Sequence, residues 1–232
     1  MLDISKIRAI TLDLDDTLWP IWPVIERAED ALATWLRRHA PATAPMFADA
    51  AERLRLREHV VSTRPDIGHN MSALRLEVIR QALARCGDDT ALADAAFEVF
   101  FDARMKVDLY DDALPALAFL AARFPLVALS NGNADVHRVG IGHFFHSSLS
   151  AHEFGVGKPD PRIFHAAAQS AGYGAQEILH IGDDAALDVQ GALAVGMQTV
   201  WVNRKQEAWP HADRPQLTVS SLAQVVEVFQ RV

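Results

Sequence analysis

The stretch ITLDLDDTLWPIWP, Ile10 to Pro23, ends an apolar run with three carboxylates, Asp13, Asp15 and Asp16. The run IRAITLDL is rich in aliphatic and β-branched residues, which predicts a buried strand that gives way to a loop. Side chains two residues apart on a strand point to the same side, so Asp13 and Asp15 are expected to face one point in space. Asp16 falls at a turn position where a left-handed backbone is needed, and we interpret it as structural. Taken alone, the same residues would also fit a strand end with a solvated acidic turn.

Three further apolar runs end in polar residues in the same way: PLVALS before Asn131, EILHIG before Asp183 and QTVWVN before Arg204. Segments of helical period, such as PRIFHAAAQSAG, lie between the later runs. This alternation is typical of an α/β protein with a parallel sheet covered by helices. In such sheets, ligands bind outside the carboxyl ends of the strands. The polar residues therefore stand where a site is expected.

Residues 20–106 show helical periodicity and no convincing strand. Apolar residues recur at helical spacing in this stretch, as in Val24, Ile25, Ala28, Leu32, Trp35 and Leu36. Prolines and the segments STRPDIGHN and CGDD divide it into roughly four helices. We expect a core formed by residues 1–19 and 107–232, interrupted by a helical cap at 20–106.

The two Trp-Pro pairs stand where the core is expected to pass into this insert. Pro20 and Pro23 restrict the backbone, which suggests a hinge. Trp19 and Trp22 either anchor the hinge by burial or line the pocket, where Trp19 would stack on a planar ring of the substrate.

The composition limits the classes of function. The chain has 232 residues, half of them hydrophobic, and a formal net charge of -8, which gives no basic patch for a nucleic acid. No apolar run is long enough to span a membrane, and no secretory signal is visible at the N-terminus. A single cysteine, Cys86, agrees with a reducing compartment. We expect a cytoplasmic protein that binds neither nucleic acid nor membrane and is a monomer or homodimer.

Other polar residues at the predicted strand ends suit an anionic ligand. ALSNGN presents the hydroxyl of Ser130 and the backbone N–H groups of Asn131 and Gly132, which are able to cradle anionic oxygens. Lys158 lies in the loop of GVGKPDPRIF, and HIGDDAALD supplies a further carboxylate, Asp188. Oxygen ligands of this kind hold hard cations such as Mg²⁺. Asp13 and Asp183 with Lys158 would leave one net negative charge, which a divalent cation reverses.

These elements, in this order, resemble the motifs of the haloacid dehalogenase-like hydrolase superfamily. The resemblance implies a Rossmann-like α/β core with an inserted all-helical cap, and hydrolysis of a phosphate ester. In that reaction Asp13 would be the nucleophile that forms an aspartyl-phosphate, and Asp15 would serve as general acid and then as general base. Ser130 and Lys158 would hold the phosphoryl oxygens.

The resemblance also implies a cofactor. Asp13, Asp183 and the backbone carbonyl of Asp15 would bind Mg²⁺. Asp188 would contact the metal through a water molecule, or would contact the residues that bind the metal and not the metal itself. The same oxygen ligands accept Mn²⁺. The role of Asp184, next to Asp183, is left open.

Asp15 separates the two main chemistries of this superfamily. Members that displace halide from 2-haloacids have another residue at this position, because a halide leaves without a proton, so the carboxylate here favours phosphate esters. The alternatives are a 2-haloacid dehalogenase and a non-catalytic metal-binding scaffold of the same fold.

The segments DLDDTLWP, PDIGHNMSALR, SNGNA and HIGDDAALDVQGA are similar to phosphatases acting on 5-amino-6-(5-phospho-D-ribitylamino)uracil and on flavin mononucleotide (FMN). A small phosphate ester is therefore the expected partner. By this resemblance His69 and Arg75 are candidates to reach the substrate from the cap, although helix capping and a solvated helix face would explain them too. We also assign Thr17, Asn131, Gly132 and Trp19 to substrate binding.

Overall fold

The computed structural model describes residues 2–231 and divides into two compact units. One combines Met1–Pro20 with Asp108–Val232, and the other is Ile21–Val107. These limits differ by one residue from those expected from the sequence. The first unit contains the sheet and the second is built of helices.

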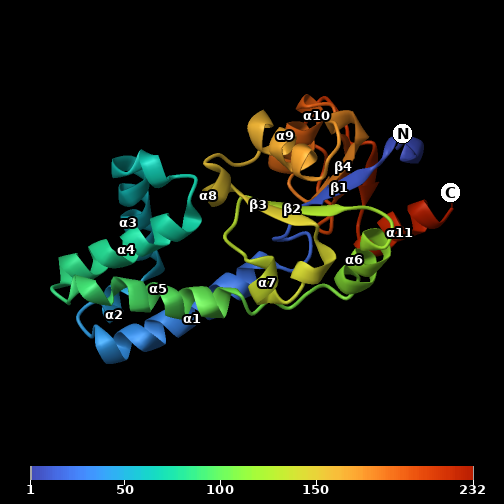
Figure 1. Cartoon of the computed structure of the whole chain (residues 1–232). Coiled ribbons are helices and arrows are strands. Elements are labelled where there is room, and N and C mark those ends of the chain that lie inside the picture. Colours follow the sequence, from blue (N-terminus) through green and yellow to red (C-terminus); the bar gives the residue numbers. More distant parts are fainter. Residues whose placement is uncertain (1, 232) are drawn as a thin grey trace. The chain divides into compact units, whose positions relative to one another are not determined.

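Within the described residues, six strands form one parallel sheet in the order β3-β2-β1-β4-β5-β6 (Figure 1). Their bounds are β1 Ala9–Leu12, β2 Leu126–Ser130, β3 Ser147–Ser150, β4 Ile178–Gly182, β5 Gln198–Val202 and β6 Leu217–Val219. All residues of β1, β2 and β4 are buried, which explains their almost continuous apolar sequences. The predicted parallel α/β sheet is confirmed.

Strand register places the ends of the three central strands level with one another. Leu12, the last residue of β1, pairs with Ala128 of β2 on one side and with Ile181 of β4 on the other. The backbone N–H of Asp13 continues this pattern by donating to the carbonyl of Ile181 at 2.9 Å. Residues that follow β1 and β4 therefore emerge side by side.

The two strands beyond the expected four, β3 and β6, lie at the two edges of the sheet. β3 has the sequence SSLS and is only partly buried, and β6 has three residues. Neither carries the apolar run that marks a central strand, because an edge strand pairs on one side only. Their place in the sheet depends on pairing with β2 and β5.

Helices cover both faces of the sheet. Figure 1 shows α9 and α10 on one face and α6 and α11 on the other. Apolar residues of α9 pack on the β1 and β2 side chains that point to that face, among them Ala9 and Val127. The helices of this unit are α6 Ala113–Ala121, α7 Val136–Val139, α8 Ala151–Phe154, α9 Pro161–Ser170, α10 Gly191–Ala194 and α11 Leu222–Gln230. A π-helical turn, Ala185–Gln190, precedes α10.

The second unit has its own apolar core. Its helices are α1 Ile21–His39, α2 Ala44–Ala48, α3 Ala50–Thr63, α4 Met71–Cys86 and α5 Ala93–Arg104. The expected count of roughly four omits α2, a short helix between Pro41 and Asp49. Leucines and alanines of α1, α3, α4 and α5 form one buried cluster, including Leu32, Leu36 and Leu83. The helical periodicity therefore reflects a core-facing side on each of these helices.

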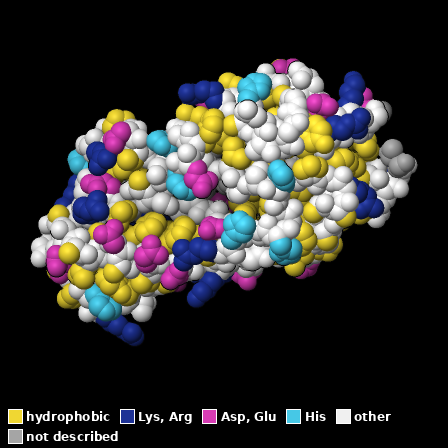
Figure 2. All heavy atoms as spheres, in the orientation of Figure 1, with side chains coloured by type: hydrophobic (Ala, Val, Ile, Leu, Met, Phe, Trp, Pro, Cys, Tyr) yellow, Lys and Arg dark blue, Asp and Glu magenta, His cyan; other side chains and the backbone are white. Residues whose placement is uncertain are grey.

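The surface carries charges of both signs. On the face seen in Figure 2, Lys and Arg side chains are interspersed with Asp and Glu. Among residues 2–231, no helix is both long enough and apolar enough to cross a bilayer.

The two tryptophans of the Trp-Pro pairs differ, because Trp19 is fully buried and Trp22 is 68% exposed. The expected anchoring by burial is therefore wrong for Trp22.

Two leucines on α3 offer a test of the helical core. Leu56 is 1% exposed and Leu54 is 53% exposed, although they are two residues apart on one helix. We expect Leu56→Ala to lower the free energy of unfolding by about 2–5 kcal/mol, because it leaves a cavity. Leu54→Ala, the matched control, is expected to change it by less than about 0.5 kcal/mol. Urea titrations measure both, and equal effects would contradict this packing.

Candidate functional site

A buried ammonium group joins two carboxylates at the carboxyl ends of the central strands. Lys158 Nζ lies 2.5 Å from Asp13 Oδ1 and 2.5 Å from Asp188 Oδ1. Asp13 follows β1, Asp188 belongs to the π-helical turn after β4, and Lys158 comes from the loop before α9. All three side chains are buried. The fold thus brings together three residues that lie 145 and 30 positions apart in the chain.

Asp188 is held from several sides. His180 Nε2 lies 3.1 Å from Asp188 Oδ1, and the backbone N–H of Asp184 donates to Asp188 Oδ2 at 2.9 Å. The other ring nitrogen of His180 lies 2.8 Å from Thr11 Oγ1. Burial lowers the pKa of His180, so the neutral ring donates from Nε2 to Asp188 and accepts at Nδ1 from the Thr11 hydroxyl. His180 is thus a buried residue with both ring nitrogens hydrogen-bonded, and it also orients Asp188.

A glycine in β4 makes room for this carboxylate. A Cβ atom at Gly182 would lie 2.3 Å from Asp188 Cγ, well inside van der Waals contact. The absence of a side chain at Gly182 therefore allows Asp188 to approach the strand and meet Lys158.

Asn131 fixes the backbone of Lys158. Its Oδ1 accepts from the Lys158 N–H at 2.7 Å, and its Nδ2 donates to the Lys158 carbonyl at 2.8 Å. Gly157 lies against this amide, since a Cβ atom there would be 2.5 Å from Asn131 Oδ1. The side chain of Asn131 is thus engaged in positioning the Lys158 loop, and the expected role of its backbone N–H toward a substrate stays a prediction.

Ser130 and Gly132 form a tight turn at the end of β2. The backbone N–H of Gly132 donates to Ser130 Oγ at 2.9 Å, and the Ser130 side chain is buried. The hydroxyl therefore lies at the strand end where the sequence placed it. The roles of Ser130 and Gly132 toward a phosphoryl group stay predictions.

The Thr17 hydroxyl contacts two of the carboxylates. This hydroxyl, fully buried, lies 3.2 Å from Asp183 Oδ1 and 3.4 Å from Asp13 Oδ2. The Thr17 hydroxyl is thus hydrogen-bonded to the site's own acids, and the assignment of Thr17 to substrate binding stays a prediction. The other possibility for a Thr at this position, a hydrogen bond to a neighbouring carboxylate, is what the structure contains.

Trp19, which the sequence analysis assigned to substrate binding, is a buried side chain. The indole ring is fully buried, and its Nε1–H donates to Asp15 Oδ1 at 2.8 Å. With no exposed ring face, Trp19 does not offer a stacking surface, and the other alternative given for it, anchoring by burial, is what the structure contains. Asp16 has a φ of 56°, so its predicted turn role in a left-handed backbone is confirmed.

Two basic residues after β5 hold the loop that follows β1, and the sequence analysis did not identify them. Arg204 donates to the Thr17 carbonyl at 3.1 Å and pairs with both oxygens of Asp112 at 2.9 and 3.2 Å. Lys205 Nζ lies 3.3 Å from Asp16 Oδ2. The segment QTVWVNRK contains a signal for these residues, because two cationic side chains follow the strand β5, which lies beside β4 and the acids after it. The sequence does not indicate which acids Arg204 and Lys205 pair with.

Remaining candidates have local roles. Asp184 Oδ1 accepts from the N–H groups of Ala186 and Leu187 at 2.8 Å each, so it caps the π-helical turn. In the helical unit, Arg75 Nη1 lies 2.5 Å from Glu29 Oε1, and its guanidinium stacks over Phe100 at 4.2 Å. His69 precedes α4, which begins at Met71. Contact of His69 or Arg75 with a substrate stays a prediction.

Burial and the proximity of several carboxyl groups shift the pKa values of the residues in the site. Burial raises the pKa of Asp13 well above its usual range against the opposing effect of Lys158, and the charges of Asp188 and Asp183 raise it further. Burial and the Asp188 and Asp16 charges raise the pKa of Asp183 to about 7. Burial also opposes ionisation of Lys158 and Asp188, but the charges of Asp13 and Asp188 raise the pKa of Lys158, and the charge of Lys158 lowers the pKa of Asp188.

The donor set fits a hard divalent cation. Carboxylate oxygens of Asp13, Asp183 and Asp188 lie within 4.8 Å of one another. When all three are ionised, Lys158 compensates one of three negative charges, and a divalent cation would neutralise the other two. Burial and the neighbouring acids raise the pKa values of Asp13 and Asp183, which favours protonation as partial compensation of this charge when no cation is bound. Asp13 and Asp183, with Asp188, are therefore the residues that would hold Mg²⁺.

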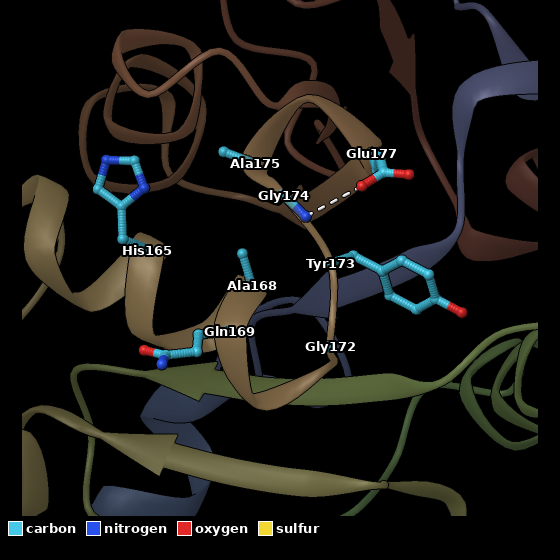
Figure 3. Close-up of a pocket in the computed structure, with 8 residues that line it drawn as sticks. All are labelled: His165, Ala168, Gln169, Gly172, Tyr173, Gly174, Ala175 and Glu177. Atoms are coloured by element: carbon cyan, nitrogen blue, oxygen red, sulfur yellow. Dashed lines mark hydrogen bonds between the residues drawn. The ribbon is translucent and has the colours of Figure 1, made fainter.

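A surface depression lies apart from these residues. It has a volume of about 420 Å³ and is lined by His165, Gln169, Tyr173, Glu177 and neighbouring small residues. Figure 3 shows the Glu177 carboxylate turned back to the backbone N–H of Gly174. Because Glu177 immediately precedes β4, this region lies at the amino ends of the strands, away from the carboxylates.

Comparisons with known proteins agree on one family. A model of the family "haloacid dehalogenase-like hydrolase" matches residues 7–196. The 5-amino-6-(5-phospho-D-ribitylamino)uracil phosphatase YigB of Escherichia coli (strain K12) is 34% identical over 97% of this chain and 98% of its own length. The phosphoserine phosphatase of Thermus thermophilus is 35% identical over 65% of this chain and 63% of its own.

A solved structure is also similar to this chain in fold and sequence. The 2-haloacid dehalogenase of Pseudomonas syringae pv. Tomato DC3000 superposes with a TM-score of 0.91 and is 38% identical, covering 97% of this chain and 99% of its own. At this level of similarity the likeness extends beyond the core to the helical insert. The names of the relatives include both phosphatases and dehalogenases.

Gly182 provides a test of the Asp188 geometry. We expect Gly182→Ala to lower the free energy of unfolding by about 1–3 kcal/mol, because the new Cβ displaces a buried, ion-paired carboxylate. Gly174→Ala is the control, since its nearest neighbour is at 3.5 Å and its φ of -78° suits any residue. Urea titrations measure both, and a fully stable Gly182→Ala protein would show that Asp188 does not need this space.

The pKa of Asp183 predicts how cation binding depends on pH. A carboxyl with a raised pKa stabilises the fold while it keeps its proton, and this contribution is lost as the pH rises from about 4 to about 7. A cation must displace that proton, so its binding weakens below about pH 7. We expect Mg²⁺ to raise the melting temperature little at about pH 5.5 and clearly at about pH 8.

The measurement is the difference in melting temperature with Mg²⁺ and with chelator at each pH, which cancels titrations common to both samples. A potassium salt at matched ionic strength controls for screening. An equal Mg²⁺ effect at both pH values would contradict the raised pKa of Asp183.

Proposed function

The chain belongs to the haloacid dehalogenase-like hydrolase family, and on that basis we propose that it is a Mg²⁺-dependent phosphatase of small phosphate monoesters. The single observation that carries the proposal is the carboxylate of Asp15, held by Trp19 two residues after Asp13. An alkoxide leaving group needs a proton, and a halide does not. A positioned acid beside the nucleophile therefore suits a phosphate ester.

The proposed reaction uses two carboxylates in sequence. Asp13 attacks phosphorus, the ester P–O bond breaks, and the departing alkoxide takes a proton from Asp15 to leave as an alcohol. Water then attacks the phosphorus of the aspartyl-phosphate and gives a proton to Asp15, while the P–O bond to Asp13 breaks and inorganic phosphate is released. Both carboxyl groups return to their starting state.

The remaining residues position the reactants. Lys158, held against Asp13, supplies positive charge for the phosphoryl oxygens, and Ser130 with the turn at Gly132 supplies hydrogen-bond donors at the end of β2. Mg²⁺ bound by Asp13 and Asp183 would neutralise negative charge that otherwise repels the phosphate dianion. Phosphoryl transfer depends mainly on such positioning and charge compensation.

The substrate class follows from the relatives. The likeness to a phosphatase of 5-amino-6-(5-phospho-D-ribitylamino)uracil extends over nearly the full length of both chains. We propose this ester or FMN as the first candidates. Both are phosphate esters of a ribityl chain attached to a planar ring system, so either would bind through the same chemistry.

A 2-haloacid dehalogenase is the second candidate, because the similar Pseudomonas syringae structure carries that name. The nucleophile, Asp13, would serve either reaction. The Asp15 carboxylate separates them, since displacement of halide gives it no proton to transfer.

Substitution of the nucleophile tests the proposed function. We expect Asp13→Asn to reduce phosphate release from p-nitrophenyl phosphate to the uncatalysed background, because an amide does not form the acyl phosphate. Phosphate release is measured with Mg²⁺ present, and circular dichroism verifies that the variant is folded. Unchanged phosphate release by Asp13→Asn would exclude the mechanism.

A metabolite screen distinguishes the candidates. Wild-type protein is assayed with Mg²⁺ on a panel of phosphate esters that includes FMN and the ribitylaminouracil phosphate. A parallel assay with 2-chloropropionate and chelator detects chloride. Chloride release without phosphatase activity would establish the dehalogenase, and Mg²⁺ binding without any turnover would favour a non-catalytic scaffold.

A further inference from the structure

Arg204 connects three segments of the sheet-containing unit. Its Nη2 donates to the carbonyl of Thr17 at 3.1 Å and to Asp112 Oδ1 at 2.9 Å, and its Nη1 donates to Asp112 Oδ2 at 3.2 Å. The guanidinium carbon lies 3.8 Å from the centre of the Tyr110 ring. One side chain after β5 thus joins the loop that follows β1 to the segment that leads into α6.

Asp112 ties this contact to two helices. Its Oδ2 also accepts from the backbone N–H of Leu222, the first residue of α11, at 2.7 Å. A carboxylate at the N-terminus of a helix is favoured by the helix dipole. Asp112 itself immediately precedes α6, which begins at Ala113. The ion pair of Arg204 and Asp112, whose side chains are 17% and 14% exposed, is therefore anchored where two helices begin.

The loop after β1 is held at two successive carbonyl groups. Arg204 donates to that of Thr17, and the backbone N–H of Tyr110 donates to that of Leu18 at 2.9 Å. Both donors belong to the network around Asp112. The backbone at Thr17 and Leu18 is therefore fixed by segments that are far from it in the sequence.

Thr17 extends this network to the carboxylates. Its carbonyl accepts from Arg204, and its hydroxyl lies 3.2 Å from Asp183 Oδ1 and 3.4 Å from Asp13 Oδ2. A threonine side chain is stiff at χ1, so the direction of the hydroxyl follows the orientation of its own backbone. A donor that fixes the Thr17 carbonyl therefore also fixes the hydroxyl between the two acids.

The contacts of Arg204 use the shape of the guanidinium group as well as its charge. A planar fork of N–H donors matches both oxygens of a carboxylate and has a donor left for the carbonyl of Thr17. A lysine carries the same charge as a point on a flexible stem, so it does not hold these acceptors in fixed directions. A role in net charge alone would be served by either residue.

We infer that Arg204 is a positioning residue for the carboxylates of Asp13 and Asp183, and that it acts through Thr17. It keeps the Thr17 hydroxyl between the nucleophile and the second acid that would hold the cation. The inference rests on the proposed function, which assigns these roles to Asp13 and Asp183. Arg204 is not a catalytic residue in this scheme, because it acts through the backbone of Thr17.

A cycle of two substitutions tests this role. Arg204→Lys retains the charge and lacks the fork, and Thr17→Val has a similar shape and lacks the hydroxyl. The double variant completes the cycle, because substitutions of two residues that act through one another are not additive. Circular dichroism verifies that each variant is folded. If Arg204→Lys does not fold, Asp112→Asn takes its place, since it removes one of the two oxygens that hold the guanidinium group.

Two quantities follow the site itself. Calorimetry gives the dissociation constant of Mg²⁺ at fixed pH and ionic strength, and hydrolysis of p-nitrophenyl phosphate gives kcat. We expect Arg204→Lys to weaken Mg²⁺ binding and to lower kcat by about 10-fold, because residues that orient metal ligands contribute about 10–100-fold. In the Thr17→Val background, the same substitution is expected to change both quantities by less than about 2-fold.

A third measurement needs neither metal nor substrate. In protein with ¹³C-labelled threonine methyl groups, the Thr17 signal is assigned by its absence from the spectrum of Thr17→Val. With chelator present, we expect Arg204→Lys to shift or broaden this signal, because the Thr17 carbonyl is no longer held in one orientation.

Arg123→Lys is the matched control. Arg123 also donates to a backbone carbonyl, that of Phe119 at 2.9 Å, and its guanidinium carbon lies 3.6 Å from the centre of the Phe119 ring. It is exposed and stands shortly before β2, toward the amino ends of the strands and away from the carboxylates. We expect Arg123→Lys to leave the Thr17 signal in place and to change Mg²⁺ binding and kcat by less than about 2-fold.

The outcomes separate the inference from the proposed function. An unchanged Thr17 signal in the Arg204 variant, or equal losses from Arg204→Lys with and without the Thr17 hydroxyl, would overturn the inference alone. Wild-type protein that hydrolyses no phosphate ester would overturn the proposed function and this inference with it. A displaced Thr17 signal, together with losses that disappear in the Thr17→Val background, supports the inference.

Discussion

The site depends on one buried electrostatic arrangement, in which the Lys158 ammonium group lies between the carboxylates of Asp13 and Asp188. Removing charges from water is costly, and this cost is offset only when each charge is closely paired. One ammonium group does not balance three acids, since Asp183 lies in the same cluster. Burial, together with the remaining negative charge, raises the pKa values of Asp13 and Asp183, so the cluster suits a divalent cation.

The parallel sheet makes this arrangement possible. Adjacent parallel strands end on the same edge, so residues after β1 and β4 meet although they are far apart in the sequence. Small residues then allow close approach: Gly182 leaves space for Asp188, and Gly157 leaves space for the Asn131 amide that fixes Lys158. These two glycines therefore help to set the distances within the site.

The loop after β1 is held from three directions. Thr17 contacts two of the acids, Arg204 binds the carbonyl of Thr17, and Lys205 pairs with Asp16. Trp19 closes the loop on Asp15. A loop held in this way presents its carboxyl groups in fixed directions, which is what the proposed proton transfer by Asp15 beside a nucleophile requires. The neutral donor on Asp15 and the cationic donor on Asp13 give two neighbouring carboxylates different surroundings.

The sequence by itself determined the parallel α/β sheet, because buried central strands need almost continuous apolar runs and helices between them need apolar periodicity. It also determined which acids stand at strand ends and that Asp16 serves the turn. It did not determine the edge strands β3 and β6, whose short or polar sequences become strands only by pairing with a neighbour. Tertiary structure alone decided that Thr17, Asn131 and Trp19 hold other site residues, and that Arg204 and Lys205 belong to the same loop. The physical reason is that hydrogen bonds and ion pairs between distant segments depend on where the fold brings each atom, and residue type specifies only which bonds an atom is able to make.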